Sequence, residues 1–448
     1  MAATDFWSIA RDVVEMAKVH GATHAEAYVS KSKELEVEVR GGKIETIKSA
    51  EDKGLGLRVF TGNQAGFAYT TDLSEKGIKS MVLQALANAR QVAGDEYYRL
   101  PEPPGGYTDM VLFDEEIERH SIEDRIAMAQ EMERAAREYD PRVKIIEGST
   151  YQDGEVEVGI VNDRGLEACY RGSACGLYIS LTAQEGDDSQ TGFALSFGRR
   201  YRALDPVAVG REAAERAIRM LGAKSQPSQE VPIVFDPFVV VSLLGVVAPA
   251  LTGEAVQKGR SLFAGKVNEK VASDLVTVVD DGTLEDGIRS APFDGEGVPT
   301  SRTVLIESGQ LRTFLHNTYT AAKDGTSSTG NGVRASFKST PEVGTTNFYI
   351  MPGNVTPEAL IGDVQSGFYV SEVMGIHTAN PISGDFSVGA AGLWIEKGRF
   401  AYPVRGVAIA GNIKDLLQRV DAVGNDLRFF GGKGAPTLRV AKMALSGS

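Results

Sequence analysis

The chain has 448 residues, more than one ordinary hydrophobic core serves, so we expect two or three domains. Hydrophobic residues make up 42% and charged residues 24%, as in folded soluble proteins, and no apolar run reaches the roughly 20 residues of a membrane span. No secretion signal is visible, and the two cysteines, Cys169 and Cys175, suit a reducing cytoplasm, where we expect the protein. A net charge of −13 without a Lys/Arg cluster argues against direct nucleic-acid binding.

The first module, residues 1–93, is predicted to be a helix, an antiparallel meander and a second helix. Apolar residues recur at helical spacing as far as Ala17, and Gly21 ends that helix. Alternating and β-branched segments then predict strands at residues 34–39, 43–49, 54–60 and 65–70. The second helix is predicted to begin near Ser74.

A linker rich in proline and glycine, residues 94–109, precedes a second module at residues 110–222. Ser121 and Asp124 form a capping-box pattern ahead of a helix that runs to about Tyr139. Strands are predicted at residues 143–149, 155–162, 166–172, 175–184 and 191–199, followed by a helix at 211–221. The same order of elements occurs in both modules, which indicates a structural repeat.

The third region, residues 230–448, is rich in glycine, β-branched residues and turn dipeptides such as Asp281-Gly282. Helices are predicted only at residues 238–257, 356–364 and 412–420. The predicted fold class is therefore α+β: two small helix–antiparallel-sheet–helix modules followed by a large, mostly antiparallel β domain.

The common catalytic motifs are missing from this sequence. It contains no GxSxG elbow, no Walker A loop, no strand-linked GxGxxG and no HExxH or HExxxH string. Of its five histidines, only His316 and His377 fall in the third region, and neither has a His or Cys close by in sequence. We therefore expect no catalytic residue and no metal ligand in this chain.

Five blocks of the third region, among them STGNGVRAS and GDFSVGAAGLWIEKG, resemble the TldD/PmbA family. They occur in the family's order, at residues 259–287, 297–311, 328–336, 384–417 and 423–427. The two modules before them are similar to the family's N-terminal and middle domains. The resemblance thus covers nearly the whole chain.

The family's TldD half carries HExxxH on a helix and a cysteine near the C-terminus, which together hold a catalytic zinc, whereas the TldE half lacks them. The HExxxH position falls here at Leu244–Pro249, which reads LGVVAP. The interval for the cysteine is residues 428–435, RFFGGKGA. The resemblance therefore implies a TldE-type chain without a cofactor, and zinc in an HExxxH-bearing partner.

Two groups of residues are candidates for substrate binding. His377, Asn380 and Asp385 lie around a block that both family halves share, and they either line a channel that grips a peptide or brace a loop. Asn331 and Arg334 either form an anion-binding nest or belong to a plain tight turn. The sequence leaves both alternatives open.

Three functions remain. The resemblance implies a metal-free subunit that completes the chamber of a metallopeptidase acting on unfolded peptides, such as leader peptides and antitoxins. The family's other label, modulator of DNA gyrase, then describes an indirect effect. The alternative is a homodimeric peptide-binding protein without hydrolytic activity. An enzyme using Asp280, Asp281 and Asp385 ranks last, because acidic residues in such positions also form ordinary turns. Either an HExxxH homologue or a second copy is the expected partner, bound through the C-terminal domain.

Overall fold

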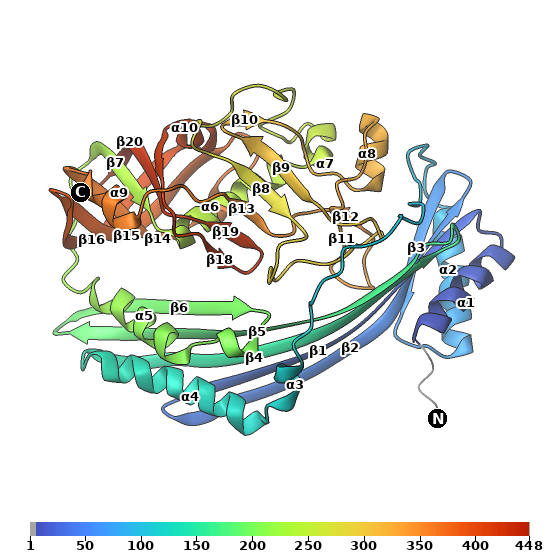
Figure 1. Cartoon of the computed structure of the whole chain (residues 1–448), viewed down its shortest axis with the longest axis horizontal. Helices are drawn as coiled ribbons and strands as arrows, with labels where there is room; N and C mark the ends of the chain where they lie inside the picture. The colour runs from blue at the N-terminus through green and yellow to red at the C-terminus, as the bar shows by residue number, and fades with distance from the viewer. Residues whose placement is uncertain (1–5, 448) are drawn as a thin grey trace.

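The computed structural model describes residues 6–447; residues 1–5, with which the first predicted module begins, and residue 448 lie outside them. A long curved sheet forms one layer, with helices on its outer side, and the C-terminal domain lies over its other side (Figure 1). The observed architecture is α+β, as the sequence predicts. Among residues 6–447, none of the helices has the length and hydrophobicity that a membrane span requires.

One six-stranded antiparallel sheet, in the order β3-β2-β1-β4-β5-β6, contains both meanders. Its strands are β1 (His24–Arg40), β2 (Lys43–Thr61), β3 (Gln64–Thr70), β4 (Val143–Asn162), β5 (Glu167–Glu185) and β6 (Asp188–Gly198). β1 and β4 pair along the middle, from Glu26 opposite Asn162 to Val39 opposite Ser149. The two modules therefore share a sheet, and its symmetric strand order is what a repeated meander produces.

Several strands are longer than the sequence predicts. β2 joins two predicted strands across the polar stretch 50–53, and β4 and β5 likewise each join two. Polar residues interrupt the hydrophobic pattern there, but the backbone pairing continues; Ser32, for example, is paired with Asp52. Backbone groups of adjacent strands form hydrogen bonds with one another whatever their side chains are. An exposed polar stretch therefore remains part of a strand when a strand lies on each side of it.

Each half of the sheet has its own pair of helices. α1 (Phe6–Val19) and α2 (Glu75–Ala89) pack on the β1–β3 end, and α4 (Ile122–Tyr139) and α5 (Pro206–Ile218) on the β4–β6 end. The predicted capping box is confirmed, because the Ser121 side chain accepts from the Asp124 amide and the Asp124 side chain accepts from the Ser121 amide. The short helices α3 (Glu115–Arg119) and η1 (Tyr201–Ala203) complete this part.

The linker before α3 contains no helix or strand among its described residues, as its prolines predict. The linker is nevertheless held by hydrogen bonds, one from the first sheet and one to the C-terminal domain. The Asn162 side chain donates to the Pro101 carbonyl at 3.0 Å, and the Tyr107 hydroxyl donates to the Gly297 carbonyl at 2.8 Å. The linker therefore connects the sheet with the C-terminal domain.

The C-terminal domain is built around two six-stranded sheets, ordered β10-β9-β8-β13-β19-β18 and β16-β15-β14-β7-β20-β17, with β11-β12 as a separate pair. Only β13–β19 and β14–β7 pair in parallel. The strands are β7 (Gln229–Phe235), β8 (Val278–Asp281), β9 (Arg302–Glu307), β10 (Gln310–Leu311), β11 (Gly332–Val333), β12 (Glu342–Val343), β13 (Phe348–Ile350), β14 (Ser366–Met374), β15 (Asp385–Glu396), β16 (Arg399–Asn412), β17 (Val420–Val423), β18 (Arg428–Phe430), β19 (Lys433–Ala435) and β20 (Leu438–Ser446).

Helix α6 (Pro237–Ala250) contacts strands of both sheets, and its apolar composition on nearly every side fits that position. The sequence predicts one helix over 238–257, but Thr252 begins a second one, α7 (Gly253–Gln257), by accepting from the Ala255 amide. The other helices are α8 (Thr318–Asp324), which the sequence did not predict, α9 (Pro357–Gly362), η2 (Ile376–Thr378) and α10 (Ile413–Gln418).

A buried ionic network joins the first sheet to the C-terminal domain. Glu26 of β1 accepts from Arg58 of β2 at 2.9 Å and also pairs with Arg334. Arg58 reaches Glu296 at 3.3 Å, and the four side chains are at most 10% exposed. An apolar cluster surrounds the network, with Tyr28, Val158, Ile160 and Leu166 from the sheet side against Phe293 and Phe337.

Replacing Glu26 with alanine should therefore destabilise the protein strongly. Two buried guanidinium groups would lose their shared carboxylate, which typically costs about 3–5 kcal/mol. Glu36→Ala is the matched control on the same strand, because Glu36 is 37% exposed and its pair with Lys48 is worth under about 1 kcal/mol. Urea unfolding of both variants measures the difference; equal losses would contradict the importance of the network.

Candidate functional site

A hollow of about 560 Å³ lies where helix α6 meets α7, at the position corresponding to the family's HExxxH. Gly245 and Pro249, the glutamate and second histidine positions of that motif, line it, being four residues apart on one face of the helix. Leu244, at the first histidine position, is buried in the core instead. This helix face therefore opens on a cavity without presenting a metal-binding side chain.

The interval in which the family has its cysteine borders the same hollow. Residues 428–435 form the β18–β19 hairpin, and Lys433 from it lines the cavity together with Pro381 and Ile382. Two segments almost 180 positions apart in sequence thus meet where the resemblance locates a metal site. Their meeting supports the assignment of both positions.

The chemistry of this hollow does not suit zinc. Its lining includes one carboxylate, Glu254, which pairs with Lys258 at 2.5 Å, and two further cations, Arg260 and Lys433. Zinc sites need several His, Cys or carboxylate donors that converge. Across residues 6–447, no group of three or more such residues is close enough to hold a metal ion.

Two of the predicted substrate-binding residues, Asn380 and Asp385, lie in the loop before β15 and at the first position of that strand. The Asn380 side chain accepts from the Ile382 and Ser383 amides at 2.9 and 3.2 Å. Asp385 accepts from the Ser383 hydroxyl at 2.7 Å and from Asn412 at 2.8 Å, and these two hydrogen bonds lower its pKa. Both side chains therefore brace the loop that brings Pro381 and Ile382 to the hollow.

His377, by contrast, is exposed on the single turn η2. It lines none of the hollows described here, although the loop that follows it does. The His377 side chain therefore takes no part in bracing this loop, unlike those of Asn380 and Asp385, with which the sequence grouped it.

The other two predicted residues are engaged inside the protein. Asn331 is 2% exposed and donates to Asp280 at 2.8 Å and to the Gly344 carbonyl at 3.0 Å. The Arg334 guanidinium is held by Glu26 and by the carbonyls of Gly295 and Ser339. The Gly330–Arg334 turn is therefore a structural junction, although Arg334 also borders a cavity.

The carboxylates of the third hypothesis serve structural roles as well. Asp280 is 1% exposed and accepts from Asn331 and from the amide and hydroxyl of Thr346. Asp281 accepts from the amide and hydroxyl of Thr283, as turn-forming aspartates commonly do. Neither arrangement resembles a carboxylate pair with room for a reacting group between its members.

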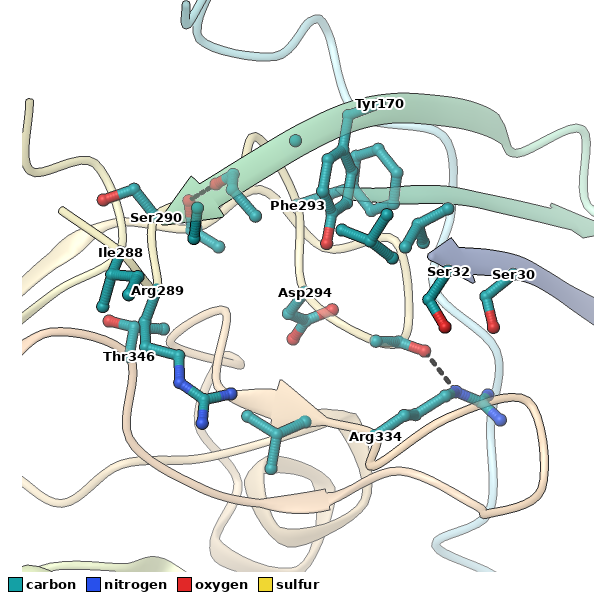
Figure 2. A pocket seen from close by; sticks show the side chains of 18 of the residues that line it. Ser30, Ser32, Tyr170, Ile288, Arg289, Ser290, Phe293, Asp294, Arg334 and Thr346 are labelled. Carbon is teal, nitrogen blue, oxygen red and sulfur yellow. Dashed lines mark hydrogen bonds between the residues drawn. The ribbon is translucent and has the colours of Figure 1, made fainter. Parts of the chain in front are cut away.

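A second cavity, of about 530 Å³, lies between the first sheet and the C-terminal domain (Figure 2). Ser30 and Ser32 of β1 and Tyr170 of β5 line one side, and Arg289 and Asp294 line the other. Figure 2 shows the Tyr170 hydroxyl, the Asp294 carboxyl and the Arg289 guanidinium directed into this hollow. The sequence did not predict this site, because its residues come from separate segments and fit no motif.

Asp294 is the most perturbed carboxyl in this cavity. Burial, and next the neighbouring Glu296, raise its pKa to about 8, although amides of Glu296, Val298 and Gly332 donate to it. It is therefore mostly protonated at neutral pH. When Asp294 is neutral, the two negative charges of Glu26 and Glu296 are matched by the two positive charges of Arg58 and Arg334.

This raised pKa predicts a dependence of stability on pH. The folded state binds a proton that the unfolded state releases near pH 4, so the free energy of unfolding should fall as pH rises from about 4 to about 8. Asp294→Asn should reduce that fall by several kcal/mol, since each unit of pKa shift corresponds to about 1.4 kcal/mol. Urea unfolding at several pH values tests this.

The control for that experiment is Asp274→Asn, because the Asp274 side chain is 75% exposed. Its pH profile should match that of the unchanged chain. A profile for Asp294→Asn with the unchanged slope would show that Asp294 is ionised in the folded protein.

Comparison with known proteins identifies the family. Models of the PmbA/TldA metallopeptidase match in order: domain 1 at residues 25–89, the central domain at 115–221 and the C-terminal domain at 228–447. "Metalloprotease PmbA" of Escherichia coli O157:H7 is 30% identical over 90% of this chain and 88% of its own length. A "Metalloprotease TldD homolog" of Haemophilus influenzae is 28% identical over 89% of this chain and 85% of its own.

Solved structures agree with this similarity over the whole length. TldE from Thermococcus kodakarensis superposes with a TM-score of 0.91 at 26% identity, covering 98% of this chain and 100% of that one. A Thermotoga maritima protein named for modulation of DNA gyrase gives 0.91 at 28% identity, covering 98% and 99%. With all three domains matched in order, this chain belongs to the PmbA/TldD metallopeptidase family.

Proposed function

We propose that this chain is a metal-free, TldE-type subunit of a metallopeptidase that acts on unfolded peptides. In this proposal an HExxxH-bearing relative holds the zinc, and this chain completes the substrate chamber. The observation that carries it is the hollow at α6. The positions of the general base and of one zinc ligand, Gly245 and Pro249, open on it, while its cations come from Lys258, Arg260 and Lys433.

The comparisons support the proposal at the level of the family. Relatives named as metalloproteases match this chain over most of their length, and both PmbA-type and TldD-type proteins are among them. The similarity to TldE extends over the whole of both chains. A homodimer that holds peptides without cleaving them is the alternative, and the partner experiment below distinguishes the two.

The central test is hydrolysis in the presence of the partner. Alone, the chain should not cleave an unfolded peptide, because no metal-bound water or activated nucleophile is available. Mixed with an HExxxH-bearing relative from the same organism, it should raise peptide hydrolysis above that of the relative alone, and a zinc chelator should stop the reaction. Folded proteins should resist.

Two results would contradict the subunit assignment. Chelator-resistant cleavage by the isolated chain would make it an enzyme in its own right. No gain in rate and no co-elution with the relative would favour the homodimeric peptide-binding protein. Elemental analysis is the accompanying control, since about one zinc ion tightly bound per isolated chain would contradict a metal-free site.

The loop before β15, which brings Ile382 to the hollow at α6, provides a prediction about individual residues. In the mixed complex, Asp385→Asn should lower turnover modestly, because it weakens the hydrogen bonds with Asn412 and Ser383 that hold the loop carrying Ile382. His377→Ala should change the rate less than tenfold. Steady-state kinetics measures both, and a loss of several orders of magnitude in either variant would identify a catalytic residue.

A further inference from the structure

The cavity between the first sheet and the C-terminal domain contains an arginine that no protein group neutralises. Arg289 is exposed at the cavity surface, and its guanidinium has neither an ion-pair partner nor a hydrogen-bond acceptor among residues 6–447. Figure 2 shows it extending into the hollow opposite Asp294. An arginine presented in this way is suited to bind an anionic group with two parallel hydrogen bonds.

The backbone that carries Arg289 is held rigidly. The buried Arg199 donates to the carbonyls of Gly287 and Ser290 at 2.8 and 2.7 Å, on either side of it. Asn347, which is fully buried, accepts from the Arg289 amide at 3.0 Å. A Cβ atom on Gly432 would lie 2.6 Å from Cγ of Arg289, so the side-chain stem lies directly against that glycine. Such support reduces the entropy that binding would otherwise cost.

Most of the other charged side chains that line the cavity are paired with an opposite charge or held by backbone groups. Arg334 is paired with Glu26, and Glu155 is paired with Lys33 and Arg171. Asp294 is mostly neutral. Glu34 lines both this cavity and a neighbouring hollow. Hydroxyl groups of Ser30, Ser32 and Tyr170 supply further hydrogen bonds across the cavity.

The cavity also continues toward the hollow at α6. A third hollow of about 430 Å³ shares Arg289, Arg334 and Thr346 with the cavity, and it shares Thr345 and Lys433 with the α6 hollow. The shared residues place these three hollows side by side, and the row from the first sheet to Gly245 and Pro249 is called the groove below. A groove of this extent fits an extended chain, which advances about 3.3 Å per residue, better than a compact small molecule.

We propose that this groove holds an extended peptide and that Arg289 binds a carboxylate of that peptide inside the cavity. The inference rests on the proposed function for the peptide nature of the ligand, and it adds a preference for an acidic residue. The carboxylate belongs either to a side chain or to the C-terminus of the peptide, and both would bind the guanidinium through the same two hydrogen bonds.

The test uses the full chain alone, with fluorescein-labelled ten-residue Gly/Ser peptides and fluorescence anisotropy. One peptide has a central Glu and an amidated C-terminus, a second has Gln in its place, and a third has Gln with a free C-terminus. A carboxylate-bearing peptide should bind about ten- to a hundredfold more tightly than the amidated Gln peptide, as expected for one charge-assisted pair. Arg289→Gln should abolish that preference.

Arg399→Gln is the matched control, because Arg399 is exposed, lines none of these hollows and has no ion pair within the described residues. It should keep the preference. The melting temperature of Arg289→Gln should equal that of the unchanged chain, since no hydrogen bond of its side chain is lost.

The outcomes separate this inference from the proposed function. Peptides that bind equally well to the unchanged chain and to Arg289→Gln would overturn the role of Arg289 while leaving a peptide-holding subunit intact. Binding of glutarate with no binding of any peptide would overturn the peptide ligand and show a small-molecule carboxylate site. The hydrolysis assay with the partner is independent of both results.

Discussion

The buried ionic network between the first sheet and the C-terminal domain determines how the molecule is assembled. Glu26 lies between Arg58 of the neighbouring strand and Arg334 of the distant domain. Burying a charge without a partner costs several kcal/mol, so each of these groups requires the others to be in place. Docking of the two parts is therefore strongly favoured in one relative position, and the width of the cavity between them follows from it.

Charge balance explains the chemistry that this cavity offers. Two carboxylates and two guanidinium groups neutralise one another in the network, and the third carboxyl, Asp294, is mostly protonated at neutral pH. Of the charged side chains that line the cavity, Arg289, Arg199 and Glu34 then remain without an ion pair among residues 6–447. The charged residues that line the α6 hollow are mostly cations, although the chain as a whole has a net charge of −13. Local charge opposite to the overall charge attracts anionic ligands to particular places.

Helix α6 has one side that packs in the core and another that lines a hollow. Its core-facing residues, such as Leu243, Leu244 and Val247, pack against both sheets and are buried. Gly245, which has no side chain, and Pro249 face the hollow, so these two residues contribute little to this packing. Residues on that face can change without loss of the core, because stability depends on the buried side of the helix.

The local sequence determined those features that neighbouring residues decide among themselves. The Ser121 capping box, the apolar α6 and the alternation of Val37 and Val39 were readable because they depend on contacts within a few positions. The family was likewise readable, because the blocks that carry the resemblance are continuous strings.

Tertiary structure alone decided the rest. The pairing of β1 with β4 joins two meanders, and no local pattern specifies which edge strands meet. Glu26 and Arg334 are 308 positions apart, so neither signals its partner in sequence. Arg289 looks like an ordinary turn residue in EDGIRS, and only the support of Arg199 and Asn347 places it in a cavity. Charge pairs and cavities form between distant segments, and their energies exist only once the fold has brought those segments together.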